Sequence, residues 1–145
     1  MAEDNKAPQF AIQRVYIKDL SFEGPNSPEI FQKEWAPELS VNLDTTNRHL
    51  DGDFYEASLK ISAKVLSNNE TAFVCELEQA GIFTLSNFDE DQREHFIESI
   101  CSEILFPFAR EAIADAVSKG GFPQLLLAPL NFEAYYQEKK KQAAK

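Results

Sequence analysis

The most constraining feature of the sequence is a strictly alternating stretch, "DFYEASLKISAKVLS", at residues 53–67. Small, polar or charged side chains separate the members of a regular apolar row. That row comprises Tyr55, Ala57, Leu59, Ile61, Ala63 and Val65. Successive side chains of a β-strand point to opposite faces, so the stretch predicts a strand with one buried face.

Three further strands are predicted around this one. The "SNNE" turn at residues 67–70 joins it to an apolar stretch at residues 71–86, which predicts a β-hairpin. In this fourth strand Val74 and Ile82 face away from the other apolar side chains, which are Phe73, Cys75, Leu77, Phe83 and Leu85. Residues 10–22 predict a first strand, and a loop with two prolines and a glycine follows it. The second strand is predicted where Leu39, Val41 and Leu43 alternate with polar residues.

Two helices are predicted after the strands. Residues 89–121 carry apolar side chains at helical spacing, with acidic residues at the start and Gly120-Gly121 at the end. Pro107 lies inside this pattern, so we expect it to kink the helix or to split it in two. A last helix is predicted to begin at Asn131 as N-cap, with Phe132, Tyr135 and Tyr136 on one face.

The order of the elements defines the fold class. Strands that precede helices, instead of alternating with them, indicate an α+β fold with a four-stranded antiparallel sheet followed by two helices. The length of 145 residues suits a single domain. We predict a flexible N-terminus at residues 1–9, the domain at residues 10–138 and a flexible basic C-terminus at residues 139–145.

The net charge of −10 excludes several classes of function. Nucleic acids and anionic membrane surfaces both require a basic footprint. Residues 1–91 contain 17 acidic and 7 basic side chains, whereas residues 92–145 contain 7 of each. The imbalance is explained either by solubility or by an acidic docking face for a basic partner.

The sequence gives little support for catalysis. Cys75 and Cys101 are the only cysteines, and neither has a base at a spacing typical of a thiol nucleophile. His49 and His95 lack the short spacing of a structural zinc site. Phosphate-binding and dinucleotide-binding motifs are also missing from the sequence, so we expect neither an enzyme nor a cofactor or metal. The first residues do not resemble a secretory signal peptide and no apolar run is long enough to span a membrane, so we expect a cytoplasmic protein with reduced thiols.

A broken apolar segment, "GGFPQLLLAPLNFEAYY" at residues 120–136, links the two predicted helices. It is too apolar for an ordinary solvated loop, and Pro123 and Pro129 make it too broken for a buried helix. Two helices cover one face of a sheet, so apolar residues on the other face indicate contact with another subunit. An ordinary monomer core with a few exposed apolar residues remains the alternative.

Five segments resemble the SecB family of protein-export chaperones. They are "FAIQRVYIKDLSFEGPN", "IFQKEWAPELSVNLDT", "ETAFVCELEQAGIF", "ILFPFAREAI" and "GGFPQLLLAPLNFEA". The resemblance implies a homotetramer, built as a dimer of dimers, that binds unfolded precursor proteins in the cytosol. It also implies that the protein keeps its clients translocation-competent without using ATP and delivers them to the SecA motor ATPase. The alternative is an acidic adaptor that binds one folded partner and captures no clients.

The resemblance also assigns roles to individual residues. Asp19, Glu23, Val74 and Glu76 match the family's SecA-binding positions, and the zinc in that contact belongs to SecA's basic C-terminal tail. Cys75, Leu77 and Gln79 match positions that affect tetramer assembly. The client-binding groove is expected at Trp35, Leu39, Val41, Leu43, Phe122, Leu125, Leu127 and Phe132, with Tyr135 and Tyr136 packing the last helix. The chain ends in "EKKKQAAK" where many relatives have an acidic tail, so a contribution of that tail to SecA binding is not expected here.

Overall fold

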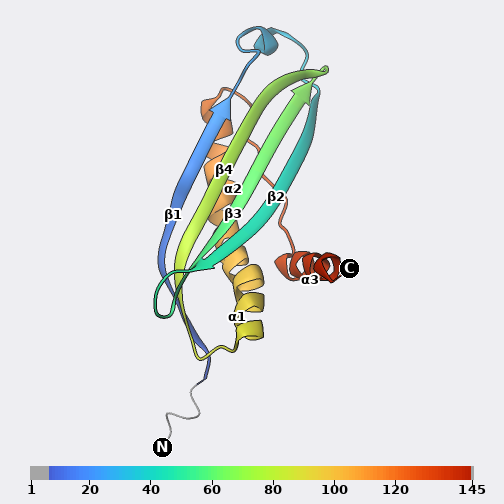
Figure 1. Ribbon diagram of the computed structural model, residues 1–145. Coiled ribbons are helices and arrows are strands. Elements are labelled where there is room, and N and C mark those ends of the chain that lie inside the picture. The colour runs from blue at the N-terminus through green and yellow to red at the C-terminus, as the bar shows by residue number, and fades with distance from the viewer. Residues whose placement is uncertain (1–6, 145) are drawn as a thin grey trace, which may run out of the picture.

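The computed structural model describes residues 7–144, which form an α+β domain with a long antiparallel sheet along one side (Figure 1). The elements in chain order are β1 (Gln9–Glu23), η2 (Glu29–Gln32), β2 (Pro37–His49), β3 (Phe54–Ser67), β4 (Glu70–Ser86), α1 (Glu90–Phe96), η3 (Ile97–Cys101), α2 (Ser102–Lys119) and α3 (Phe132–Ala143). The strand order is β1-β4-β3-β2, which makes β1 and β2 the edge strands. The predicted fold class is confirmed.

The sheet has two chemically different faces. On the helix face, Ala63 of β3 pairs with Cys75 of β4, and Ile61 pairs with Leu77; all four side chains are buried. On the opposite face, which we call the outer face, Ser62 pairs with Glu76 and Lys64 pairs with Val74. The alternation at residues 53–67 therefore predicts both faces of β3 correctly.

The β3–β4 hairpin has the turn that its sequence predicts. Asn68 and Asn69 have φ angles of 53° and 65°, which asparagine tolerates better than most residues and which suit the twist of a two-residue hairpin. Strand β2 is longer than predicted, since it runs from Pro37 to His49. Pro37, which has no backbone N–H to donate, is tolerated there because it is the first residue of an edge strand.

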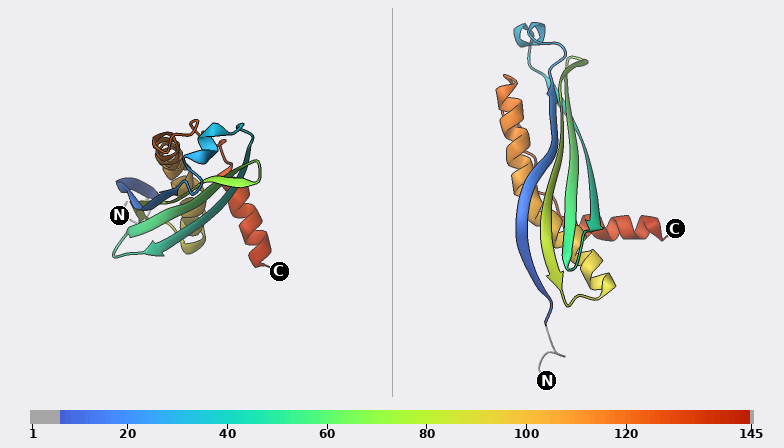
Figure 2. Two further views of the ribbon diagram at one scale, coloured as in Figure 1. Left: turned by 90° about the horizontal axis from the view of Figure 1, so that it is seen from above. Right: turned by 60° about the vertical axis from the view of Figure 1, so that its left-hand side comes forward.

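The core lies between the helix face and α2 (Figure 2). Leu105, Ile113 and Val117 of α2 are fully buried, as is Leu59 of β3. Gly81 of β4 permits this close approach, since a Cβ there would lie 3.0 Å from the Arg14 carbonyl oxygen and 3.1 Å from Leu105 Cδ2. The helix is therefore held within direct packing distance of the sheet.

Helix α2 runs through Pro107 without a break, so Pro107 does not split the predicted helix, and a kink at Pro107 stays a prediction. Asp89 caps α1: its side chain accepts a hydrogen bond from the Gln92 amide at 2.8 Å, and the Gln92 side chain accepts one from the Asp89 amide. The irregular turn lies earlier, in the π-helical segment η3 at Ile97–Cys101. Widened turns of this kind interrupt a helix without ending it.

Helix α3 projects from the β2 side of the body (Figure 2). The Asn131 side chain accepts a hydrogen bond from the Ala134 amide at 2.9 Å, as predicted for an N-cap. The helix continues to Ala143, so the boundary predicted at residue 138 falls inside it. Lys139, placed by prediction in a flexible tail, donates to the Thr45 carbonyl at 3.0 Å and to Glu98 at 3.3 Å. Of the predicted N-terminus, residues 1–6 lie outside the described part of the chain, and β1 begins at Gln9.

Candidate docking and client-binding surfaces

The four residues predicted to bind SecA lie together on the outer face. Glu23 pairs with Val74, and the next outward positions of β1 and β4 are Ser21 beside Glu76. Asp19 then pairs with Glu78, which adds a carboxylate that the sequence comparison did not assign. Lys60 of β3 borders the stripe beside Glu78. The strand register therefore aligns these side chains along β1 and β4 on the outer face. We call the surface formed by Asp19, Glu23, Val74, Glu76 and Glu78 the acidic stripe.

A second surface is built around the ring of Phe122. Its centroid lies 4.9 Å from that of Phe31, 5.7 Å from Trp35 and 5.0 Å from Phe73. Phe122 and Phe73 are buried, whereas Phe31 and Trp35 are 47% and 38% exposed. The buried rings thus support an exposed aromatic surface, which we call the aromatic ledge. Phe31 was missed by the sequence analysis, although it lies in the same crossover as Trp35.

The predicted groove residues divide into an exposed and a buried set. Leu39 and Val41 lie on the helix face of β2 and are exposed, and Leu43 and Leu125 are half-buried. Phe122, Leu127 and Phe132 are almost fully buried in the core. The most exposed leucines of the linking segment are Leu126 and Leu130, at 63% and 43%. The assignment of individual residues to the groove stays a prediction. Phe122, Leu127 and Phe132 are core residues, so they can only support a groove surface by packing beneath it.

The residues predicted to affect tetramer assembly are all buried inside one subunit. Cys75 is fully buried, and Leu77 and Gln79 are 3% and 2% exposed on the helix face. Burial, with a smaller contribution from the Glu76 charge, raises the pKa of the Cys75 thiol. Burial raises the pKa of Cys101 to about 12. Any effect of these side chains on assembly therefore passes through the packing of the sheet, and the thiols are held protonated.

Glu56 is a buried carboxylate at the centre of a network on the outer face. Its Oε2 accepts a hydrogen bond from the Tyr16 hydroxyl at 2.6 Å, and its Oε1 accepts from Lys18 Nζ at 3.2 Å and Arg48 Nε at 3.1 Å. The side chain is 8% exposed. Burial alone would raise the pKa of Glu56, but these hydrogen bonds outweigh it and hold the pKa below its ordinary value. The network joins β1, β3 and β2.

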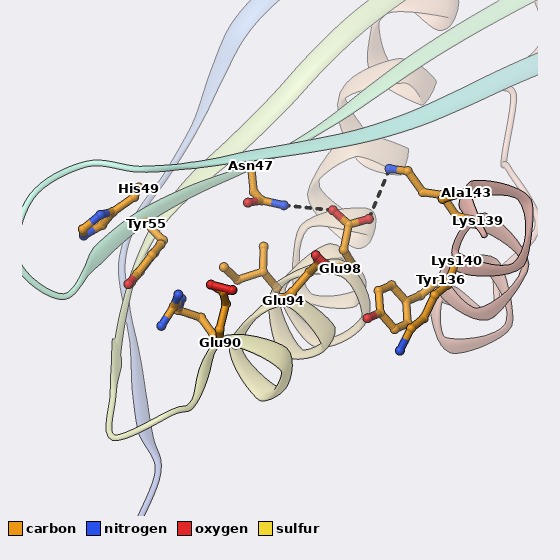
Figure 3. Close-up of a pocket in the computed structure, with 12 residues that line it drawn as sticks. Asn47, His49, Tyr55, Glu90, Glu94, Glu98, Tyr136, Lys139, Lys140 and Ala143 are labelled. Carbon is orange, nitrogen blue, oxygen red and sulfur yellow. Dashed lines mark hydrogen bonds and ion pairs between the residues drawn. The ribbon is translucent and has the colours of Figure 1, made fainter. Parts of the chain in front are cut away.

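A cavity of about 500 Å³ lies between the β2–β3 end of the sheet, α1 and α3 (Figure 3). Glu98 forms one wall and accepts hydrogen bonds from Thr45 at 2.7 Å, Asn47 at 2.9 Å and Lys139 at 3.3 Å. Figure 3 shows the Asn47 and Lys139 side chains converging on this carboxylate from opposite sides. These contacts fasten α3 to the sheet.

The histidines are already engaged in the fold. His95 Nε2 lies 2.6 Å from Glu133 Oε1, and the ring stacks on Tyr136. His49 Nε2 lies 2.7 Å from the Gly52 carbonyl oxygen. Among residues 7–144, no group of three His, Cys, Asp or Glu side chains is arranged to hold a metal ion. Over the same residues, no helix is long and apolar enough to cross a membrane.

Comparison with known proteins identifies the family. The family model described as preprotein translocase subunit SecB matches residues 3–143. The chain belongs to the SecB family. The protein-export protein SecB of Hydrogenovibrio crunogenus is 49% identical over 138 residues, covering 95% of this chain and 93% of that protein. The protein-export protein SecB of Legionella pneumophila is 48% identical over 143 residues, covering 99% of this chain and 88% of the relative.

A solved structure shares the fold. A SecB-like chaperone of Mycobacterium tuberculosis, solved in complex with a ChAD peptide from an antitoxin, matches with a TM-score of 0.65. The alignment covers 83% of this chain and 90% of that chain, at 15% sequence identity. The SecB family is a chaperone family of preprotein translocation and not an enzyme family. Membership therefore supports the chaperone interpretation over the adaptor alternative.

Proposed function

We propose that this protein is an ATP-independent cytoplasmic chaperone that holds unfolded precursor proteins translocation-competent and delivers them to the SecA motor ATPase for export. The observation that carries this proposal is the aromatic ledge, because it exposes Phe31 and Trp35 above a buried aromatic core. Leu39 and Val41 add exposed apolar area on β2. Burial of a large apolar side chain contributes roughly 1.5–3 kcal/mol, so a few such contacts hold an unfolded chain without sequence-specific recognition.

The acidic stripe is the proposed docking site for SecA. It carries Asp19, Glu23, Glu76 and Glu78, and Val74 supplies an apolar contact. The partner surface is the basic, zinc-bearing C-terminal tail of SecA, so the zinc ion belongs to the partner. The stripe and the aromatic ledge lie on opposite faces of the sheet, because the ledge packs onto Phe73 on the helix face. A client and SecA therefore have separate binding surfaces on one subunit.

The edge strand β1 supports the proposed homotetramer. Four apolar side chains of β1 are exposed in the isolated chain: Phe10, Ile12, Ile17 and Leu20. A long unpaired edge with apolar side chains is prone to pair with another chain unless it is covered. We propose that a second copy covers it, and that two such dimers associate. The protein acts by binding alone and uses neither a cofactor nor ATP.

The single tryptophan provides a direct test of client binding. Trp35 is 38% exposed, so burial beneath a client should shift its emission to shorter wavelength. The probe is a permanently unfolded model protein, added to the wild-type protein and, as a blank, to Trp35→Phe. Light scattering on the same mixtures measures the mass of the assembly with and without client. If the Trp35 emission spectrum and the mass of the assembly both stay unchanged at saturating client concentrations, client capture is refuted.

A further inference from the structure

Strand β1 carries two bulges, and the second one decides which residues reach the outer face. Pairing with β4 skips one residue between Ile12 and Arg14, and again between Ile17 and Asp19. The second skipped residue is Lys18. Because side chains alternate along a strand, one inserted residue reverses the facing of every residue beyond it. Asp19 and Glu23 therefore face outward only because Lys18 is bulged.

Regular alternation would give the opposite result. Tyr16 already faces outward, so without the bulge Leu20 and Phe22 would follow it outward and Asp19 would face the helices. In the structure Phe22 packs on Phe73 at a centroid distance of 5.6 Å. Its ring also occupies the space that a Cβ on Gly120 would need. The bulge thus turns Phe22 onto the core, where it is partly buried, and completes the acidic stripe in one step.

Two buried polar side chains form hydrogen bonds with the bulged segment, one on each face of the sheet. On the outer face, Glu56 accepts hydrogen bonds from Tyr16 and from Lys18 itself. On the helix face, Gln79 donates from Nε2 to the Tyr16 carbonyl oxygen at 3.1 Å. Gln79 Oε1 is a buried atom without a hydrogen-bond partner among the described residues. An unpaired polar atom in the interior lowers stability. Stability alone therefore does not explain a glutamine at position 79, whose hydrogen bond to the Tyr16 carbonyl indicates another role.

We propose that Glu56 and Gln79 are positioning residues for partner docking, which hold the Lys18 bulge and so keep Asp19 and Glu23 beside Glu76 on the outer face. The inference rests on the proposed function, because the docking surface is the acidic stripe. Tyr16, Lys18 and Arg48 cover the Glu56 carboxylate, so it acts through Asp19 and not by touching the partner. Gln79 thereby has a role inside the subunit, in place of a direct contact in the tetramer.

The first test measures SecA binding by Glu56→Gln against Asp51→Asn. Both variants remove one negative charge, and among residues 7–144 the Asp51 side chain takes part in no hydrogen bond or ion pair, so the pair separates positioning from overall charge. We expect Glu56→Gln to weaken binding of purified SecA about three- to tenfold, a range typical of coupled neighbours, and Asp51→Asn to change it less than twofold. Binding of an unfolded model client should be unchanged in both.

A double-mutant cycle then separates positioning from mere stability. If Glu56 acts through Asp19, Asp19→Asn weakens SecA binding less in the Glu56→Gln background than in the wild-type protein. Additive losses would overturn the positioning role. Gln79→Leu supplies a second variant, since it removes the donor to Tyr16 and also the unpaired Oε1. We expect it to weaken SecA binding with little loss of melting temperature.

Hydrogen exchange tests the bulge without SecA. The amides of residues 16–20 should exchange faster in Glu56→Gln and Gln79→Leu than in the wild-type protein or Asp51→Asn. Unchanged exchange in both variants overturns the inference. If exchange accelerates while the wild-type protein fails to bind SecA, the proposed partner is wrong and the support of the bulge by these residues is upheld.

Discussion

Charge reversal of Glu76 should weaken SecA binding and leave client capture intact. Glu76 lies on the outer face between Ser21 and Ser62, and no ion pair of its carboxylate is described. Its replacement by lysine therefore breaks no side-chain hydrogen bond or ion pair among residues 7–144, and the free energy of unfolding should change by less than about 0.5 kcal/mol. The change acts only on a partner that faces the acidic stripe.

The size of the effect follows from Coulomb's law. Two unit charges about 5 Å apart in a dielectric constant of about 80 interact with roughly 0.8 kcal/mol. Reversal changes the charge by two units, or about 1.7 kcal/mol for each facing cation of the partner. Since about 1.4 kcal/mol corresponds to a tenfold change in affinity, Glu76→Lys should weaken SecA binding by about ten- to twentyfold.

The assay is titration of SecA at two salt concentrations, with Asp51→Lys as the matched charge reversal on the β2–β3 turn. The wild-type affinity should fall with added salt, because the screening length is only about 8 Å at physiological ionic strength. Glu76→Lys should show a shallower salt dependence, and Asp51→Lys should resemble the wild-type protein. Equal loss of SecA and client binding in Glu76→Lys, or equal effects of the two reversals, would refute the assignment of docking to the acidic stripe.

Three further predictions concern the fold. Gly120→Ala places a methyl group against the Phe22 ring and should lower the free energy of unfolding by about 1–3 kcal/mol in urea denaturation, so an unchanged midpoint would contradict the packing. Because the folded-state pKa of Glu56 lies below its ordinary value of 4.5, its contribution is present above pH 4.5 and is lost as the pH falls through the folded-state value. The melting temperature of Glu56→Gln should therefore fall less steeply than that of the wild-type protein as the pH is lowered. An equal fall of the two melting temperatures with pH would argue against this. The thiols of Cys75 and Cys101 should resist a thiol reagent until the protein unfolds, and stoichiometric labelling of the native protein would contradict their burial.

Much of the fold could be predicted because local patterns in this chain agree with its tertiary structure. The alternation of residues 53–67 sets both faces of β3, and Asn68 and Asn69 set the hairpin. The length of α1–η3–α2 was also predicted, but not the π-helical turn at Ile97–Cys101, because the sequence around it keeps the helical spacing of apolar residues. The fastening of α3 through Lys139 was missed, because a basic run near a chain end does not reveal a buried carboxylate far away in the sequence.

The candidate site was predicted only as a set of positions. Resemblance to the family supplied Asp19, Glu23, Val74 and Glu76, and the structure shows that register brings them to one face. Resemblance does not separate exposed groove residues from buried ones, since one matching apolar segment contributes to both. Phe122 is buried while Phe31 is exposed, because the link after Gly121 turns the Phe122 ring inward onto Phe73.

The spacing of the apolar residues in β1 reflects the two bulges of this strand. Along "FAIQRVYIKDLSF" the side chains facing the helices are Phe10, Ile12, Val15, Ile17, Leu20 and Phe22. The steps between them alternate between two and three residues, and each step of three falls on a bulge. A strand without bulges would keep steps of two. The irregular spacing therefore indicates a strand whose side-chain alternation reverses twice. The second reversal turns Asp19 and Glu23 to the outer face, toward a partner.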